Sequence, residues 1–294
     1  MDYTTVAQLI EEAAAAKKRI SDIVLADQAD YMEQPEKDLI AMMDERLKVM
    51  EESIKKSQKK GLKSTSGLTG GDAYKMMKYY EKDEGLLGTF TDRAVARAIG
   101  VAEYNAGMGK IVAAPTAGSC GIMPGCLFSM MQEKNCSRDS ILMAMFTAAA
   151  VGMVINNRAS LSGATGGCQA ECGSAAAMTA AALTELMGGT PAQCGEAAAI
   201  ALKNQLGLVC DPVAGLVEIP CIKRNAQGVV TAFCAADMAL SGIRSYIPVD
   251  EVISAMKSIG NALPETLKET AGGGLAATPT GQRLKAQVFA TKEQ

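Results

Sequence analysis

The chain has 294 residues, a formal net charge of −3 and 21% charged residues. This length is sufficient to bury one large core, and the charge balance excludes the basic excess that nucleic-acid-binding proteins carry. We therefore expect a small molecule or another protein as partner, and no nucleic acid.

The N-terminal segment reads as an amphipathic helix rather than as a secretory signal. The longest apolar run, residues 141–155, is shorter than the roughly 18 residues needed to cross a bilayer. We expect a soluble, cytoplasmic protein without a membrane partner.

Helix-forming residues dominate the long segments, aromatic residues are only 4%, and alternating strand patterns are almost absent. These features predict an all-α fold, a large helical bundle whose glycine-rich inter-helix loops form the site. In chain order, helices are predicted over residues 4–26, 35–59, 72–82, 92–106, 137–156, 174–187, 191–206, 229–246, 249–262 and 264–270.

The chain divides into two regions of different amino-acid composition. Residues 1–60 are charged and amphipathic, which indicates an outer layer of helices that is not an independent domain. Residues 61–294 are small, apolar and interrupted by glycines, and we expect them to form the catalytic helical domain.

Nine cysteines and no histidine make thiolate the only soft metal ligand that this chain offers. Cys168, Cys210 and Cys221 lie in irregular segments rich in glycine and proline, so they are candidate metal ligands. No C-x-x-C pair occurs, which argues against a thioredoxin-like or zinc-ribbon site. Cys120 is a weaker candidate for lining the site, and Cys172 is an alternative ligand.

Four loops rich in Gly, Ser, Thr and Asn separate the predicted helices. Such loops bring backbone N–H groups close to an anionic ligand such as a carboxylate. The alternative is that their glycines only cap helices and allow close packing. The loops are residues 63–71, 114–125, 156–168 and 207–221.

Together the loops and cysteines resemble the alpha chain of bacterial iron–sulfur-dependent L-serine dehydratase. The segments that carry the resemblance are KSTSGLTGG, APTAGSCGIMPG, NRASLSGATGGCQAE and CDPVAGLVEIPC, which occur in the order of that family and within residues 60–285.

The resemblance implies that Cys168, Cys210 and Cys221 hold three irons of a [4Fe–4S] cluster. The fourth iron would then accept the serine β-hydroxyl as a Lewis acid, and loss of the α-proton and of water would lead to pyruvate and ammonia. No pyridoxal phosphate is expected, because that cofactor would call for an α/β fold with a glycine-rich phosphate cup.

The loops also offer groups for the substrate. Glu171 is a candidate for pairing with the ammonium or for tuning a ligand loop, and Lys63 and Arg158 are cationic candidates, so the catalytic prediction is Lys63 and Glu171. Helix capping is the alternative role for the candidate carboxylate donors. These donors are Ser64, Ser66, Thr69, Thr116, Ser119, Asn157 and Ser160.

The absence of histidine also bears on catalysis, because removal of the substrate α-proton needs a positioned base and histidine is the usual one. The resemblance implies a separate beta subunit that supplies a histidine, so the alpha chain alone is expected to be poorly active. A lysine in cis, Lys63 or Lys110, is the alternative base.

Two other functions stay open at this point. One is a related cluster lyase that acts on L-cysteine, and the other is a non-catalytic helical subunit that binds a cluster or nothing. The sequence leaves open the oligomeric state, the substrate pose, and whether the reaction serves serine degradation or gluconeogenesis.

Overall fold

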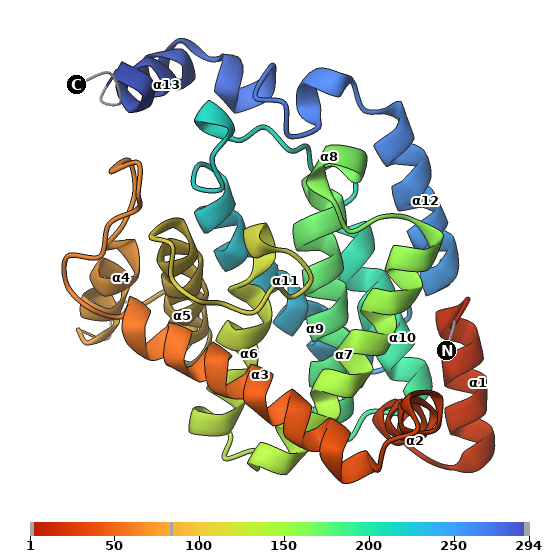
Figure 1. The fold of residues 1–294 in the computed structure, drawn as a ribbon. Helices are drawn as coiled ribbons and strands as arrows, with labels where there is room; N and C mark the ends of the chain where they lie inside the picture. The colour runs from red at the N-terminus through yellow and green to blue at the C-terminus, as the bar shows by residue number, and fades with distance from the viewer. Residues whose placement is uncertain (1–2, 83–84, 291–294) are drawn as a thin grey trace.

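The computed structural model describes residues 3–82 and 85–290, and this part of the chain is a bundle of helices without a β-strand (Figure 1). The prediction of an all-α fold is confirmed. The α-helices are α1 (Val6–Ala16), α2 (Ile20–Met32), α3 (Glu36–Ser57), α4 (Asp72–Tyr80), α5 (Gly88–Ala106), α6 (Ile122–Glu133), α7 (Arg138–Arg158), α8 (Gly163–Gly166), α9 (Ser174–Leu186), α10 (Pro191–Lys203), α11 (Cys221–Leu240), α12 (Val249–Ala262) and α13 (Pro279–Ala290).

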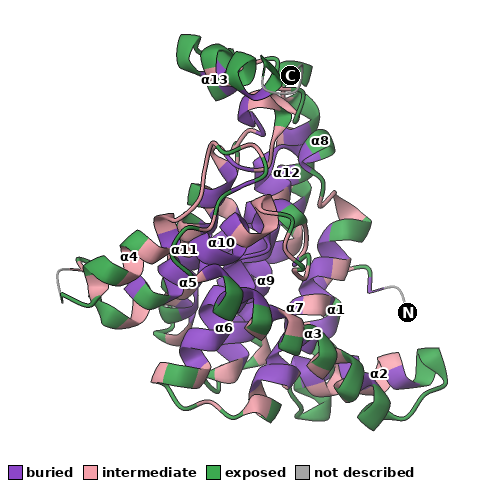
Figure 2. Ribbon diagram, turned by 60° about the vertical axis from the view of Figure 1, so that its left-hand side comes forward, coloured by how far each residue is buried: buried purple, intermediate pink, exposed green. Residues whose placement is uncertain are grey.

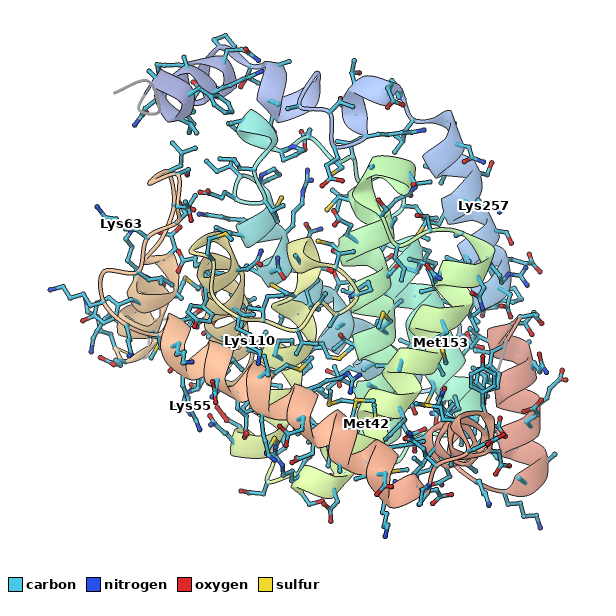
Figure 3. All side chains as sticks on the ribbon, viewed as in Figure 1. Met42, Lys55, Lys63, Lys110, Met153 and Lys257 are labelled. Atoms are coloured by element: carbon cyan, nitrogen blue, oxygen red, sulfur yellow. The ribbon has the colours of Figure 1, made fainter. Side chains whose placement is uncertain are left out.

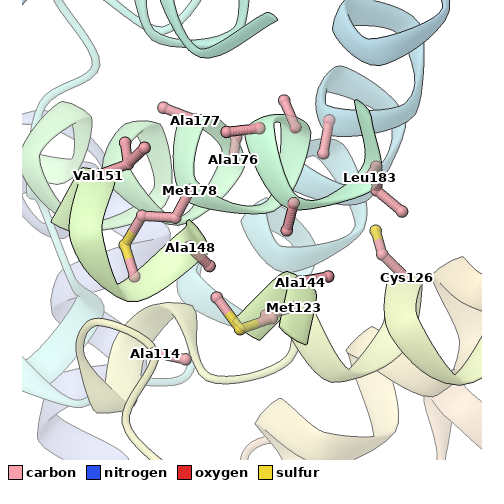
Figure 4. Packing of buried hydrophobic residues seen from close by; sticks show 14 of the residues in the cluster. Ala114, Met123, Cys126, Ala144, Ala148, Val151, Ala176, Ala177, Met178 and Leu183 are labelled. Atoms are coloured by element: carbon pink, nitrogen blue, oxygen red, sulfur yellow. The ribbon is translucent and has the colours of Figure 1, made fainter. Parts of the chain in front are cut away.

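The centre of the bundle is α9, which α7, α10 and α11 surround. Every residue of α9 from Ser174 to Glu185 is buried, and half of them are alanines. Figure 4 shows how Ala176 and Ala177 let the helix approach its neighbours, with Met178 beside Val151 of α7. Small side chains therefore replace large ones in the core, and close backbone approach maintains the packing.

The helices of residues 1–60 cover one side of this centre. The helix α3 crosses the outside of the bundle, and its inward face buries Leu39, Leu47 and Met50. Exposed residues dominate its other face (Figure 2). The amphipathic pattern of this region thus corresponds to one buried and one solvated surface.

The helix α7 is long and apolar enough to span a membrane by length and composition alone. In the structure 67% of its most apolar window is buried inside the bundle. This burial is typical of the core helix of a helical protein.

The prediction of one helix over residues 4–26 is wrong, because two helices meet there. The first ends at Ala16, and the next residue, Lys17, adopts a left-handed conformation with φ 54°. The second begins after Arg19, whose backbone N–H and guanidinium both donate to Asp22. Three consecutive basic residues offer no apolar contact to continue the first helix, so a turn forms.

Other helix boundaries also differ from prediction. The helix α11 begins at Cys221 rather than at residue 229, and residues 264–270 form only the short 3-10 turn η4 (Glu265–Leu267). The helices α6 and α13 and the short α8 are absent from the prediction. The sequence of α6 suggests a loop because of its glycines. In the structure these glycines allow close packing against α5.

The segments that carry the site gather at one end of the bundle. Figure 1 places α8, the connection from α10 to α11 and the beginning of α11 at this end. There the backbone of Cys210 exchanges hydrogen bonds with residues 267 and 269. The backbone at Cys210 is therefore anchored to the segment that follows α12.

Candidate active site

Cys168 lies between α8 and α9, at the beginning of a single π-helical turn, η2 (Gln169–Gly173). The backbone N–H of Gln169 donates to the Leu208 carbonyl at 2.9 Å. Its side-chain amide donates to the Met256 carbonyl at 3.0 Å. Because π turns interrupt regular helix geometry and occur often at functional sites, this turn is a suitable place for a ligand residue.

Cys210 and Cys221 are the first and last residues of segment 210–221, which we call the second cysteine segment. The Cys210 N–H donates to the Leu267 carbonyl at 2.9 Å. Cys221 is the first residue of α11, and its carbonyl accepts a hydrogen bond from the Asn225 side chain at 2.9 Å. Asn225 also donates to the Gly118 carbonyl at 2.7 Å, so it fixes the start of α11 to the 114–125 loop.

The three predicted cysteine ligands come together in the structure. Cys168, Cys210 and Cys221 are 3%, 3% and 7% exposed, although 41 and 10 residues separate them in the chain. The Cys168 thiol raises the pKa of both Cys210 and Cys221 through electrostatic interaction, and the Cys221 thiol raises that of Cys210 in the same way. Cys172 belongs to the same group, with its sulfur 3.5 Å from that of Cys168.

The protonation of these thiols differs by environment. Burial raises the pKa of Cys221 to about 12 and raises that of Cys210 as well. The hydrogen bond with Cys172 and the positive charge of Arg224 lower the pKa of Cys168, although burial opposes them. Cys168 is therefore the thiol closest to its metal-binding, thiolate form.

The donor set fits an iron–sulfur group, because the converging side chains are thiols and no imidazole exists in the chain. Within residues 3–82 and 85–290, however, no three Cys, Asp or Glu side chains have the spacing of a preassembled metal site. Two of the thiols hold their protons tightly, and ligation requires them to release these protons and turn toward one centre.

Glu171 lies beside these thiols. Its Oε2 is 3.8 Å from the Cys210 sulfur, and its Oε1 accepts a 2.8 Å hydrogen bond from the Thr116 hydroxyl. Burial raises the pKa of Glu171, and the Thr116 hydrogen bond partly opposes this effect. A Cβ atom at Gly163 would lie 2.7 Å from Oε2 and 2.9 Å from the Cys210 sulfur. The absence of a side chain at Gly163 thus leaves room for both groups.

The 63–71 loop reaches the second cysteine segment through Thr69, whose hydroxyl donates to Glu218 at 2.6 Å. Ser64 is buried, and its hydroxyl lies 3.2 Å from that of Ser66 and accepts from the Thr69 N–H. Lys63 is exposed and lies at the outer edge of the molecule (Figure 3). Three of the predicted carboxylate donors therefore form one hydrogen-bonded loop.

The remaining candidates divide into two groups. Thr116 and Ser119 lie at the 3-10 turn η1 (Ala117–Ser119), their hydroxyls are 3.2 Å apart, and Thr116 contacts Glu171. Asn157 instead donates to the Tyr3 carbonyl at 3.4 Å, and Arg158 donates to the Thr4 carbonyl at 3.2 Å. Ser160 accepts from the Ser162 N–H within its own loop. The structure therefore joins Thr116 and Ser119 to the thiol site and directs Asn157 and Arg158 to the N-terminal segment.

Comparison with known proteins identifies the family. The sequence profile of the family described as serine dehydratase alpha chain matches residues 15–276. The chain belongs to this family. The resemblance that we found in the loop segments is thereby confirmed.

Two alpha chains are similar to this protein over nearly its full length, and a longer protein is similar to part of it. The probable L-serine dehydratase alpha chain of Bacillus subtilis is 50% identical over 287 residues, which cover 98% of this chain and 95% of that protein. The L-serine dehydratase alpha chain of Peptoniphilus asaccharolyticus is 43% identical over 281 residues, 96% of each chain. The L-serine dehydratase of Streptomyces coelicolor is 46% identical over 181 residues, which are 61% of this chain and 40% of that protein.

In this family member, sequence reasoning missed two charged residues of the site. Arg224 donates to the Val209 carbonyl at 2.8 Å and to Asp211 at 2.9 Å, and it faces the Cys168 thiol. Asp211 is buried and also accepts from the Leu275 N–H at 2.7 Å. Their closeness to the cysteines in the sequence could have revealed them, because Asp211 directly follows Cys210 and Arg224 is three residues after Cys221.

Proposed function

We propose that the chain is the alpha subunit of an L-serine dehydratase that converts L-serine to pyruvate and ammonia. The observation that carries this proposal is the convergence of three buried thiols with Glu171, in a member of the serine dehydratase alpha chain family.

The proposed cofactor is a [4Fe–4S] cluster that Cys168, Cys210 and Cys221 hold, and pyridoxal phosphate has no part in the proposal. When bound, the cluster supplies a Lewis acid for the β-hydroxyl of serine. Cys172 is the alternative ligand, because its sulfur lies 3.5 Å from that of Cys168.

The protein groups bind and orient the substrate around this centre. We assign the substrate carboxylate to the hydroxyl groups of the 63–71 loop and of Thr116 and Ser119, since both loops contact the residues of the thiol site. Glu171 is assigned to the ammonium group, because its carboxyl is buried beside Cys210. Lys63 stays a candidate catalytic cation at the exposed start of its loop, and the roles of Asn157 and Ser160 stay predictions.

The base for the α-proton is assigned to a histidine of a partner, because this chain contains none. The word "alpha" in the names of the relatives supports a second, beta subunit. The L-serine dehydratase of Streptomyces coelicolor matches this chain over only 40% of its length, which leaves room for such a part in a single chain.

Anaerobic reconstitution with iron and sulfide tests the cofactor assignment. We expect about four irons per wild-type chain and the visible absorbance of an iron–sulfur cluster. Cys168→Ala, Cys210→Ala and Cys221→Ala should each lose most of this iron and absorbance. Cys234→Ala is the matched control, since Cys234 is exposed and should retain both.

Full iron content in all three ligand variants would contradict the ligand assignment, and a colourless wild-type protein would contradict the cluster. With the partner present, assays on L-serine, L-cysteine and L-threonine test the substrate. Faster turnover of L-cysteine with release of sulfide would favour the alternative lyase.

A further inference from the structure

Cys172 is a buried thiol outside the proposed set of three cluster ligands. Its side chain is 1% exposed, and a hydrogen bond joins its sulfur to that of Cys168 at 3.5 Å. Within residues 3–82 and 85–290, no other two thiols are joined in this way. A second thiol therefore lies in direct contact with one of the proposed ligands.

The two thiols belong to one turn of the chain. Cys168 directly precedes the π-helical turn η2, and Cys172 is the fourth residue of that turn. Residues four apart on a helix lie on the same side, with their Cα atoms about 6 Å apart. Disulfides in proteins span Cα atoms at about 4.4 to 6.8 Å, so this spacing is compatible with a covalent bond between the two sulfurs.

The surroundings of the pair favour this bond. Both side chains pack into a small apolar cluster with Ile122 and Ala175, so no polar side chain separates the sulfurs. They must approach from 3.5 Å to about 2.0 Å. Gly167 directly precedes Cys168 and has a φ of 77°, a conformation that glycine adopts at low cost, so the backbone can move at this point.

The other two proposed ligands are directed elsewhere. The Cys210 sulfur lies 3.8 Å from the Glu171 carboxyl, and the Cys210 backbone is held by Leu267. Cys221 is the first residue of α11. Neither forms a hydrogen bond with the Cys172 sulfur among the described residues. Cys168 is therefore the natural partner of Cys172.

We propose that Cys168 and Cys172 form a reversible oxidation site, at which hydrogen peroxide converts the two thiols to a disulfide. Peroxide first transfers an oxygen to the Cys168 sulfur: its O–O bond breaks, an S–O bond forms and water leaves. The Cys172 sulfur then attacks, so that the S–S bond forms, the S–O bond breaks and a second water leaves. Two thiols are oxidised and one peroxide is reduced to two waters.

The disulfide has two consequences for the chain. It removes Cys168 from the ligands, so the oxidised chain cannot hold the proposed cluster. It also stops oxidation at a reversible stage, because a sulfenic acid without a neighbouring thiol is oxidised further to an irreversible sulfinic acid. The effect on cluster binding rests on the proposed function, whereas formation of the disulfide does not.

Peptide mapping of the full-length chain, purified without iron, tests the disulfide. The chain is treated with excess hydrogen peroxide, its free thiols are alkylated, and trypsin then releases residues 159–203 as one peptide that contains Cys168, Cys172 and Cys194. Fragmentation of this peptide in the mass spectrometer should show a disulfide between Cys168 and Cys172 and an alkylated Cys194. In Cys172→Ala the same treatment should give a sulfinic acid at Cys168.

Iron binding after reduction tests the protective role. Each oxidised sample is treated with dithiothreitol and reconstituted with iron and sulfide, and its iron is compared with that of the untreated sample of the same variant. Wild type should regain most of its iron, and Cys172→Ala less than about half. Cys194→Ala is the matched control, because Cys194 is also 1% exposed but belongs to the main core, and it should recover as wild type does.

A wild-type chain without the disulfide between Cys168 and Cys172, or with Cys168 joined to Cys210 or Cys221, would overturn the inference. Equal iron recovery in wild type and Cys172→Ala would overturn the protective role. A chain that binds no iron before oxidation would contradict the proposed cluster instead. The peptide map requires neither cluster nor turnover, so its failure would not bear on the proposed dehydratase function.

Discussion

Arg224 brings a positive charge to a site that otherwise contains thiols and carboxyl groups. Its guanidinium links the Val209 carbonyl to Asp211 and faces Cys168. Three thiolates around a cluster carry a negative charge that burial makes costly, and an adjacent cation reduces this cost. The same residue ties the cysteine segment to α11, so it has an electrostatic and a structural role.

Replacement of Arg224 should therefore weaken the binding of the proposed cluster. In Arg224→Met we expect faster loss of iron to a chelator under anaerobic conditions, by about tenfold. Arg224→Lys should lie between this variant and the wild type, because it keeps the charge but not the two-pronged hydrogen bonding. The measurement is the decay of visible absorbance after the chelator is added.

The control for Arg224→Met is Lys223→Met. The neighbouring Lys223 is exposed and pairs with Asp72, so its loss should leave iron release unchanged. Equal rates of iron release in wild type and Arg224→Met would show that the guanidinium has only a structural role.

At the scale of helices, α6 packs against α5 through glycine. A Cβ atom at Gly121 would lie 2.2 Å from the backbone oxygen of Ala98. A Cβ atom at Gly228 of α11 would lie 2.3 Å from the Cδ1 atom of Ile122, which is the end of a flexible side chain. The first contact can be relieved only by moving a helix, and the second by turning one side chain.

Gly121→Ala should therefore destabilise the protein by about 2 kcal/mol, as overpacking of a core does. Gly228→Ala should cost clearly less, because Ile122 can adopt another rotamer. Urea denaturation of both variants measures the difference in unfolding free energy. Similar costs for the two substitutions would contradict this account of the contact between α5 and α6.

The same glycines explain which helices could be predicted from sequence. Long segments such as α3, α7 and α9 have helix-forming residues throughout, and their prediction is confirmed within a few residues. The helix α6 begins Ile122-Met-Pro-Gly, which locally favours a loop, and only tertiary packing makes it helical. Local propensity contains no information on that packing.

The residues of the candidate site also divide into those that the sequence indicates and those that only the structure reveals. The resemblance of their segments to the serine dehydratase alpha chain implied that Cys168, Cys210 and Cys221 act together, and the structure brings them close to one another. The hydrogen bond between Thr116 and Glu171 and the position of Arg224 join residues far apart in the chain, so no local pattern reveals them. Asn157 belongs to a signature segment but contacts Tyr3, because the end of α7 lies beside the N-terminal segment.

At the scale of the whole molecule, the proposed function assigns no residue of this chain to the removal of the α-proton of serine. The chain contains no histidine, and the Glu171 carboxyl is buried and hydrogen-bonded to Thr116. Lys63 and Lys110 are both exposed to solvent. These features are the reason for which the proposed function assigns the base to a second chain.

We expect the reconstituted alpha chain alone to retain its cluster but to convert serine at least about 100-fold more slowly than the two-chain complex, since a positioned base contributes at least this factor. Pyruvate formation measures turnover, and the cluster absorbance shows that the chain is intact during the assay. Adding the purified beta chain to the same sample should restore the rate, which separates a missing base from a damaged cluster. Turnover by the alpha chain alone at the rate of the complex would contradict the two-chain site. Loss of that turnover in Lys63→Met but not in Lys110→Met would then assign the base to Lys63, because both lysines are exposed and differ mainly in their loop.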